Sequence, residues 1–167
     1  MLFRSVGIGL AATPSMARAQ QPIGYAYGGP MDASMRLRSA AWNVGGGGEW
    51  GIGHKWSVGG ELSYLNLPGG ERRTQWGGES QPPANVLLVS ANASRHFGGS
   101  SRSSWRPFVT GGVSAMPGLG LFNAGAGVDR WISPHAGIRL EIRDQFWASA
   151  YGADSAMLGF RAGIVFR

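Results

Sequence analysis

The sequence contains no cysteine and almost no lysine. The missing cysteine excludes a disulfide framework, thiol chemistry and a thiolate metal site. Lys55 is the single lysine among 15 basic residues, a bias that favours coding composition over a phosphate-binding design. Charged residues make up only 14% of the chain and hydrophobic residues 43%. This balance excludes a disordered or nucleic-acid-coating protein and predicts a folded domain with a core.

Long apolar runs are also missing. No segment offers the ~20 consecutive apolar residues that a membrane-spanning helix needs, so any insertion into a membrane must use strands. Glycine, by contrast, is abundant, at 29 of 167 residues. It follows no Gly-X-Y period, which excludes collagen, and its frequency predicts backbones that approach one another closely.

The first residues, 1–19, are typical of an export signal. Arg4 gives a short positive region, an apolar stretch follows, and 17–19 read Ala-Arg-Ala, a small-x-small cleavage pattern. A short buried helix is the alternative, but Pro14 interrupts it. We therefore expect a removed signal peptide and a single mature domain over 20–167.

Beyond the signal, apolar residues alternate with small, polar or charged ones, which is the period of a β-strand. Every second residue from Ala156 to Phe166 is apolar, and in 135–146 the apolar residues alternate with three successive charges. Similar segments are 41–52, 55–66, 85–97, 105–116 and 120–131, with a weaker one at 22–29 in which Ile23, Tyr25 and Tyr27 share a face. Seven clear strands and a weaker eighth result.

These strands predict an all-β fold, an eight-stranded antiparallel up-and-down transmembrane β-barrel. Outer-membrane barrels of bacteria have even strand numbers, strands of at least ~9–11 residues, and apolar side chains facing outward. Long connections at 30–40, 67–84 and 147–155 would lie outside the cell if the first strand runs outward from the periplasm. The connection at 117–119 is the short exception.

A soluble sandwich or lipocalin-like barrel would show the same alternation, with the apolar face turned inward. The export signal and the inward glycines favour the membrane barrel instead. Aromatic residues near strand ends also suit two interfacial girdles; they are Trp42, Trp50, Trp56, Tyr64, Phe97, Trp105, Trp131, Phe146 and Trp147.

Four stretches resemble one family. They are Pro107–Val113 (PFVTGGV), Leu121–Trp131 (LFNAGAGVDRW), Gly137–Asp144 (GIRLEIRD) and Gly159–Arg167 (GFRAGIVFR). In this order they resemble the small bacterial outer-membrane β-barrel domain proteins, related in architecture to the OmpA membrane domain. The resemblance implies insertion by the outer-membrane barrel assembly machinery and, for most members, no defined activity. Such barrels usually end on an aromatic residue, whereas here Arg167 follows Phe166, which puts the efficiency of insertion in question.

We predict no cofactor, no metal site and no catalytic residue. The run of glycines at 45–48 lacks the strand-to-helix transition and Lys-Ser/Thr of a phosphate loop. His54, His96 and His135 lack paired ligand spacing, although all three are expected near the periplasmic rim, where a weak metal contact remains an alternative.

Ser155 and the pair Arg72 and Arg73 are expected at the outer rim, and we predict a functional site at neither. Ser155, after Asp154, resembles the serine of outer-membrane barrels that modify lipid A, but a serine needs a base within reach and we expect every histidine at the opposite side. Arg72 and Arg73 could contact lipopolysaccharide phosphates, but acids in the same loop offset their charge, so a solvated loop is favoured.

The inward charges predict a structural network in the lumen. Its expected members are Glu49, Glu61, Asp129, Arg139, Glu141, Arg143 and Arg161. If 146 faces 156 across the last hairpin, Glu141 lies opposite Arg161 and the two should form an ion pair.

The function we expect is that of an outer-membrane barrel with a structural or surface-interaction role, a narrow salt-bridged lumen and no large pore, because eight strands leave an interior about filled by side chains. A small gated, porin-like conductance is the main alternative. A lipid A-modifying enzyme and a soluble periplasmic barrel rank lower. The expected partners are outer-membrane lipid and, during biogenesis, the assembly machinery, with no nucleic acid and no identified surface ligand.

Overall fold

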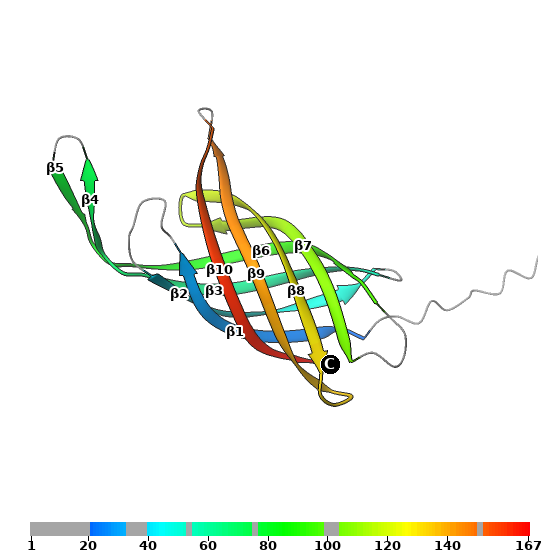
Figure 1. Cartoon of the computed structure of the whole chain (residues 1–167). Coiled ribbons are helices and arrows are strands. Elements are labelled where there is room, and N and C mark those ends of the chain that lie inside the picture. Colours follow the sequence, from blue (N-terminus) through cyan, green and yellow to red (C-terminus); the bar gives the residue numbers. More distant parts are fainter. Residues whose placement is uncertain (1–20, 33–39, 53–54, 75–76, 99–103, 150–151) are drawn as a thin grey trace, which may run out of the picture.

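The computed structural model describes residues 21–32, 40–52, 55–74, 77–98, 104–149 and 152–167. Eight strands form a closed barrel in the order β1-β10-β9-β8-β7-β6-β3-β2, and every neighbouring pair is antiparallel (Figure 1). The barrel strands are β1 Ile23–Asp32, β2 Ala40–Gly51, β3 Trp56–Leu67, β6 Ala84–His96, β7 Trp105–Met116, β8 Leu119–Trp131, β9 Ala136–Ser149 and β10 Gly152–Phe166. The predicted eight-stranded barrel is confirmed. The predicted signal peptide lies outside the described residues, none of which belongs to a helix long and apolar enough to cross a membrane.

Two long connections contain more regular structure than we expected. Within 67–84, β4 Gly70–Thr74 and β5 Gly77–Gln81 form a separate two-stranded sheet that projects from the barrel (Figure 1). In the last hairpin, β9 and β10 continue to Ser149 and Gly152, well into the predicted loop 147–155. Backbone pairing in both places extends beyond the apolar alternation from which the strands were predicted.

The predicted faces of most strands are also confirmed. Each barrel strand from β2 onward turns large apolar side chains outward, and these are 39% to 60% exposed. Examples are Val44, Leu62, Val89, Val113, Phe122, Leu140 and Ile164. The inward positions carry glycine, serine, asparagine and the charged residues, so the barrel has an apolar outside and a largely polar middle.

The first strand is different, because its apolar face points inward. Ile23, Tyr25 and Tyr27 are 6%, 4% and 5% exposed, where the rule for membrane barrels would turn them to lipid. Two glycines of β2 make room for the rings: a Cβ on Gly45 would lie 2.7 Å from the Tyr27 hydroxyl, and one on Gly47 2.7 Å from the Tyr25 hydroxyl. Part of the glycine excess therefore serves this packing.

The interior also changes character along its length. At the end opposite the start of β1 and the end of β10, buried Met31, Ala41, Leu65, Leu88, Leu121 and Met157 form an apolar cluster. We call this cluster the apolar cap. It was not predicted, since the alternation indicated small or polar residues at inward positions. It fills the lumen where the strands lead into the connections at that end.

Leu140→Arg should lower the free energy of unfolding by about 2–4 kcal/mol, because an arginine there would face the lipid near the bilayer midplane. Leu140 is 39% exposed on the outer face of β9. Urea titration in micelles measures the change. Ser104→Arg, placed at the barrel rim, is the matched control and should cost only about 0–1 kcal/mol. A neutral Leu140→Arg variant would be incompatible with the assigned face.

The β4–β5 hairpin should be accessible from outside the cell. A trypsin-like protease added to intact cells should cut near Arg72 and Arg73, while Lys55, at the opposite end of the barrel, should be cut only after the outer membrane is opened. Peptide mapping distinguishes the two sites. Hairpin cleavage that requires an opened membrane would reverse the predicted orientation.

Candidate functional site

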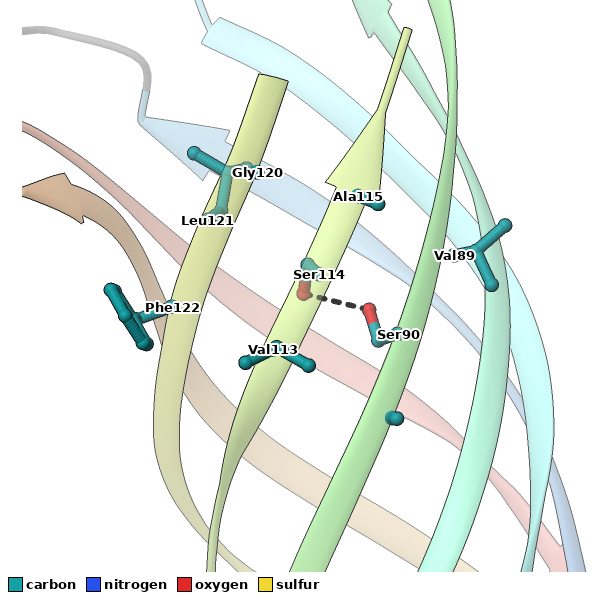
Figure 2. A pocket seen from close by; sticks show the side chains of 9 residues that line it. Val89, Ser90, Val113, Ser114, Ala115, Gly120, Leu121 and Phe122 are labelled. Atoms are coloured by element: carbon teal, nitrogen blue, oxygen red, sulfur yellow. Dashed lines mark hydrogen bonds between the residues drawn. The ribbon is translucent and has the colours of Figure 1, made fainter. Parts of the chain in front are cut away.

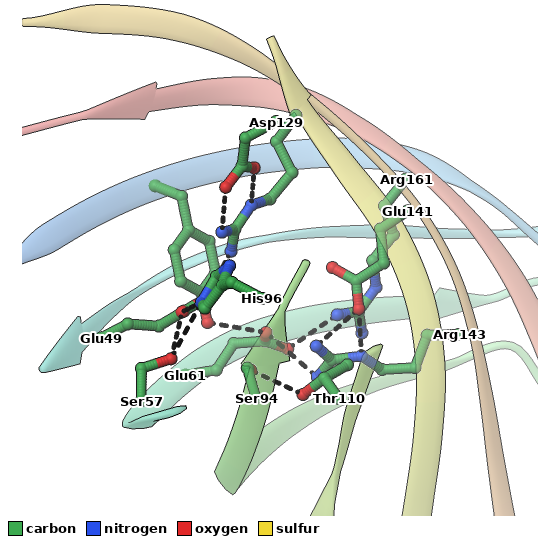
Figure 3. A network of polar contacts seen from close by, with 12 residues as sticks. Glu49, Ser57, Glu61, Ser94, His96, Thr110, Asp129, Glu141, Arg143 and Arg161 are labelled. Carbon is green, nitrogen blue, oxygen red and sulfur yellow. Dashed lines mark hydrogen bonds and ion pairs between the residues drawn. The ribbon is translucent and has the colours of Figure 1, made fainter. Parts of the chain in front are cut away.

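The predicted lumen residues all lie inside the barrel, where each is at most 5% exposed. They form two groups (Figure 3). In the first, Arg139 donates from Nε to Asp129 Oδ1 at 2.7 Å, from Nη2 to Asp129 Oδ2 at 3.0 Å, and from Nη1 to Glu49 Oε1 at 2.7 Å. One guanidinium thus engages carboxylates of β8 and β2 with the planar fork that suits such pairing.

The second group is centred on Glu61. Its carboxylate accepts from Arg161 Nη1 at 2.9 Å, Arg143 Nη1 at 3.2 Å, the Tyr27 hydroxyl at 2.7 Å and the Tyr25 hydroxyl at 3.2 Å. A buried carboxylate requires such bonds to offset the loss of hydration. The two tyrosines provide part of this, which explains why β1 turns its aromatic face inward.

The predicted Glu141–Arg161 ion pair is wrong, although the register behind it is right. Phe146 pairs with Ala156, and Glu141 lies directly opposite Arg161. Glu141 is bound by Arg143 instead, with Nε to Oε1 at 2.6 Å, and Arg161 reaches Glu61. Long arginine side chains can select an acid elsewhere in a narrow lumen, so cross-strand opposition alone does not fix the partner.

One ion pair spans the whole lumen. In the barrel order, β9 and β3 are separated by four steps in either direction and therefore lie on opposite walls. Arg143 on β9 and Glu61 on β3 nevertheless meet at 3.2 Å. Their side chains meet across the lumen at this level.

Several residues of the network escaped the sequence analysis. Tyr25 and Tyr27 were assigned only to a weak strand, and Ser57 was included only as part of the strand predicted over 55–66. Arg106 lies opposite Asp129 in the register and is half-buried. Extending the inward parity of 105–116 back to Arg106 could have found it, whereas the inward turn of β1 has no comparable signal.

A serine, a histidine and an acid also meet in the lumen, beside the first group, in which Arg139 binds Glu49. The Ser57 hydroxyl donates to Glu49 Oε2 at 2.8 Å and lies 3.0 Å from His96 Nε2, which is itself 3.1 Å from Glu49 Oε2. A catalytic triad uses both ring nitrogens, one toward the nucleophile and one toward the acid. Here both contacts share Nε2, and Nδ1 is buried without a partner among the described residues. The geometry is that of a structural bond network.

A second polar layer lies between the ion pairs and the apolar cap. The Ser90 and Ser114 hydroxyls are 2.8 Å apart, and Asn123 Nδ2 donates to Ser114 at 2.9 Å. These contacts join β6, β7 and β8 across the inner wall. The side-chain amides of Asn43 and Gln145 have no partner among the described residues.

A pocket of about 560 Å³ lies over β6, β7 and β8 at the same height (Figure 2). Val89, Val113 and Phe122 line it with side chains that are 50% to 54% exposed, and Ala91, Ala115 and Gly120 leave it open. The exposed lining belongs to the outer apolar face. The pocket therefore suits a lipid chain better than a polar substrate.

No protein-family model matches the chain, and no curated protein matches its sequence. Solved structures do match. The N-terminal β-barrel domain of Pseudomonas aeruginosa OprF has a TM-score of 0.57 and 18% identity, covering 89% of this chain and 100% of that one. Neisserial surface protein A has a TM-score of 0.59 and 10% identity, and the match covers 87% of this chain and 94% of that one. The Yersinia pestis attachment invasion locus protein Ail, solved in complex with the heparin analogue sucrose octasulfate, has a TM-score of 0.54 and 13% identity. The match covers 87% of this chain and 95% of that one.

The chain has the fold of the small outer-membrane β-barrels. At these identities the similarity concerns the fold alone, and it agrees with the resemblance noted in the four sequence stretches. Two features of the chain itself support the same assignment, namely the closed eight-stranded topology and the largely apolar outer face. Together they place it in the outer membrane.

The Glu61–Arg161 contact should show strong coupling in a double-mutant cycle. Each of Glu61→Gln and Arg161→Gln should cost about 3–5 kcal/mol of unfolding free energy, because each leaves a buried charge without its partner. The double variant should cost clearly less than the sum, as measured by urea titration in micelles.

The cycle of Glu141→Gln with Arg161→Gln is the matched comparison, since these residues are opposite in register but bound to other partners. Its coupling energy should be the smaller of the two. The reverse ranking would contradict the observed pairing and restore the local pair.

Proposed function

We propose that this small outer-membrane barrel has a structural or surface-interaction role and a plugged lumen with no large pore. The observation that carries the proposal is the Arg143–Glu61 contact between opposite walls. An open pore needs a continuous path for water and ions along the barrel axis. This pair interrupts that path at the middle of the lumen, and the apolar cap interrupts it again at one end.

The energetics support a barrel that stays closed. Arg139 and Arg143 are each bonded to two carboxylates. Moving either side chain aside would leave buried charges unpaired, at a cost of several kcal/mol. Eight strands enclose an interior about wide enough for side chains alone, so a displaced arginine has no alternative site inside.

The β4–β5 hairpin supports the surface-interaction part of the proposal. It is a separate two-stranded sheet that extends beyond the barrel (Figure 1). Its pairing places Arg72 opposite Glu79 and Glu71 opposite Ser80. A projecting, paired element offers contact area that a short turn cannot, and we assign no particular ligand to it.

For biogenesis we propose recognition by the barrel assembly machinery through Phe166, which is 50% exposed at the end of β10. Arg167 does not cover this ring: its guanidinium lies 4.3 Å from the Trp131 ring centroid and its Nε donates to the Pro134 carbonyl at 2.8 Å. The Arg167 side chain is thus held to one side, which leaves the Phe166 ring accessible. Outer-membrane lipid is the other partner we propose, and no enzymatic role is part of the proposal.

A narrow gated conductance is the second candidate function. It is favoured by the polar layer below the apolar cap, where Asn43, Gln145 and two nitrogens of Arg161 are buried without partners among the described residues. Buried polar groups of this kind are commonly satisfied by water. A water file beside the ion pairs could carry small currents if the apolar cap moved.

Conductance in planar bilayers tests the proposal. The unmodified protein should show no large open steps, and the double variant Glu61→Gln/Arg143→Gln should show small fluctuating steps, because it removes the pair that crosses the lumen. Leu88→Val, which keeps the apolar cap apolar, is the control and should remain silent. A large conductance in the unmodified protein would replace the plugged barrel with a channel.

A further inference from the structure

Two arginines lie on the outer surface of the barrel, against aromatic rings. The Arg95 guanidinium is 5.6 Å from the centroid of the Trp56 ring and 5.5 Å from that of Phe97. The Arg130 guanidinium is 5.0 Å from the centroid of Trp105. The three rings are 40% to 49% exposed. We call these five residues the basic-aromatic belt.

The belt lies at one rim of the barrel. Arg95 and Arg130 are the second-to-last residues of β6 and β8, while Trp56 and Trp105 are the first residues of β3 and β7. The four strands are consecutive neighbours in the barrel, and all four positions lie at the rim where β1 begins and β10 ends. Arg95 is opposite Trp56 and Arg130 is opposite Trp105 in the registers. Between β6 and β7 the register pairs Arg95 with Val109, so the belt consists of two arginine–aromatic groups at the same rim.

The positive charge of the belt is not neutralised by the protein. The ion pairs that the structure gives between described side chains lie in the lumen, and neither Arg95 nor Arg130 takes part in one of them. The described acids at this end are Glu49 and Asp129, and both point inward, where Arg139 binds them. An exposed acid that could screen Arg95 or Arg130 is thus missing from the described strands of this rim.

Exposed apolar side chains lie beside both arginines on the neighbouring strands. Val109 is opposite Arg95, and Ile138 is opposite Arg130. They are 44% and 42% exposed. A molecule that contacts both the arginines and this surface needs an anionic head and an apolar tail, which a free anion in solution does not have.

We propose that the basic-aromatic belt binds the phosphodiester head group of an anionic phospholipid in the leaflet at the rim where β1 begins and β10 ends. A guanidinium stacked on a ring keeps its N–H edges available, and two of these edges can hold phosphate oxygens in a bidentate manner. Tryptophan rings are favoured at the level of lipid head groups. The acyl chains of the lipid then lie along Val109 and Ile138.

The test uses the full protein in phosphatidylcholine vesicles that contain either brominated phosphatidylglycerol or brominated phosphatidylcholine. Bromine quenches nearby tryptophan fluorescence, so the two titrations give the relative binding constant of the anionic and the zwitterionic lipid. The unmodified protein should prefer phosphatidylglycerol several-fold, by up to about fivefold for each belt arginine. Arg95→Gln/Arg130→Gln should bring the ratio close to one.

Two variants serve as controls, and heat-modifiable gel mobility verifies that each is folded. Arg72→Gln/Arg73→Gln removes the same charge from the β4–β5 hairpin and should keep the preference of the unmodified protein. Arg95→Lys/Arg130→Lys keeps the charge without the planar fork and should retain only part of it. An unchanged ratio in the glutamine variant, an equal loss in the hairpin variant, or full retention by lysine would overturn the proposal. None of these results depends on whether the lumen conducts.

Discussion

The small cross-section of the barrel is the constraint on which the rest of the structure depends. Only a narrow barrel allows Arg143 of β9 and Glu61 of β3 to meet at 3.2 Å from opposite walls. The same lack of space requires glycine at Gly45 and Gly47, where a Cβ would press on backbone oxygens of β3 as well as on the hydroxyls of Tyr27 and Tyr25. Those hydroxyls in turn bind Glu61. Glycine content, the inward face of β1 and the central ion pairs therefore form one solution to a crowded interior.

Acidic and basic residues near one rim lie on different sides of the barrel wall. Glu49 and Asp129 are withdrawn into the lumen, where Arg139 binds both. Near them, Arg95 and Arg130 face outward on rings at the same rim. Acidic side chains bound in the interior cannot balance exposed arginines, because the barrel wall and its lipid-facing side chains separate the two. The outer surface at this end is thus basic even though the interior is close to balanced.

The sequence predicted the strands and their faces because both follow from a period of two, which a closed antiparallel sheet requires throughout. It predicted the members of the ion-pair network for the same reason, and even the opposition of Glu141 and Arg161. Which carboxylate each arginine binds could not be predicted from the sequence, because an arginine side chain reaches past its cross-strand neighbour to acids that are distant in sequence. The inward face of β1 was missed because tyrosine suits either a lipid interface or a polar interior, and only the hydroxyl partner decides between them.

The observed ion pairs connect different strands from those that the predicted Glu141–Arg161 pair would connect. A Glu141–Arg161 bond would join β9 to β10, which thirteen register pairs already hold together. The bonds from Arg143 and Arg161 to Glu61 instead link β9 and β10 to β3. Contacts between distant strands resist separation of the walls, whereas contacts within a hairpin do not. The ion pairs that cross the lumen are consequently also bonds between distant walls, so the plug that we propose and the stability of the fold depend on the same contacts.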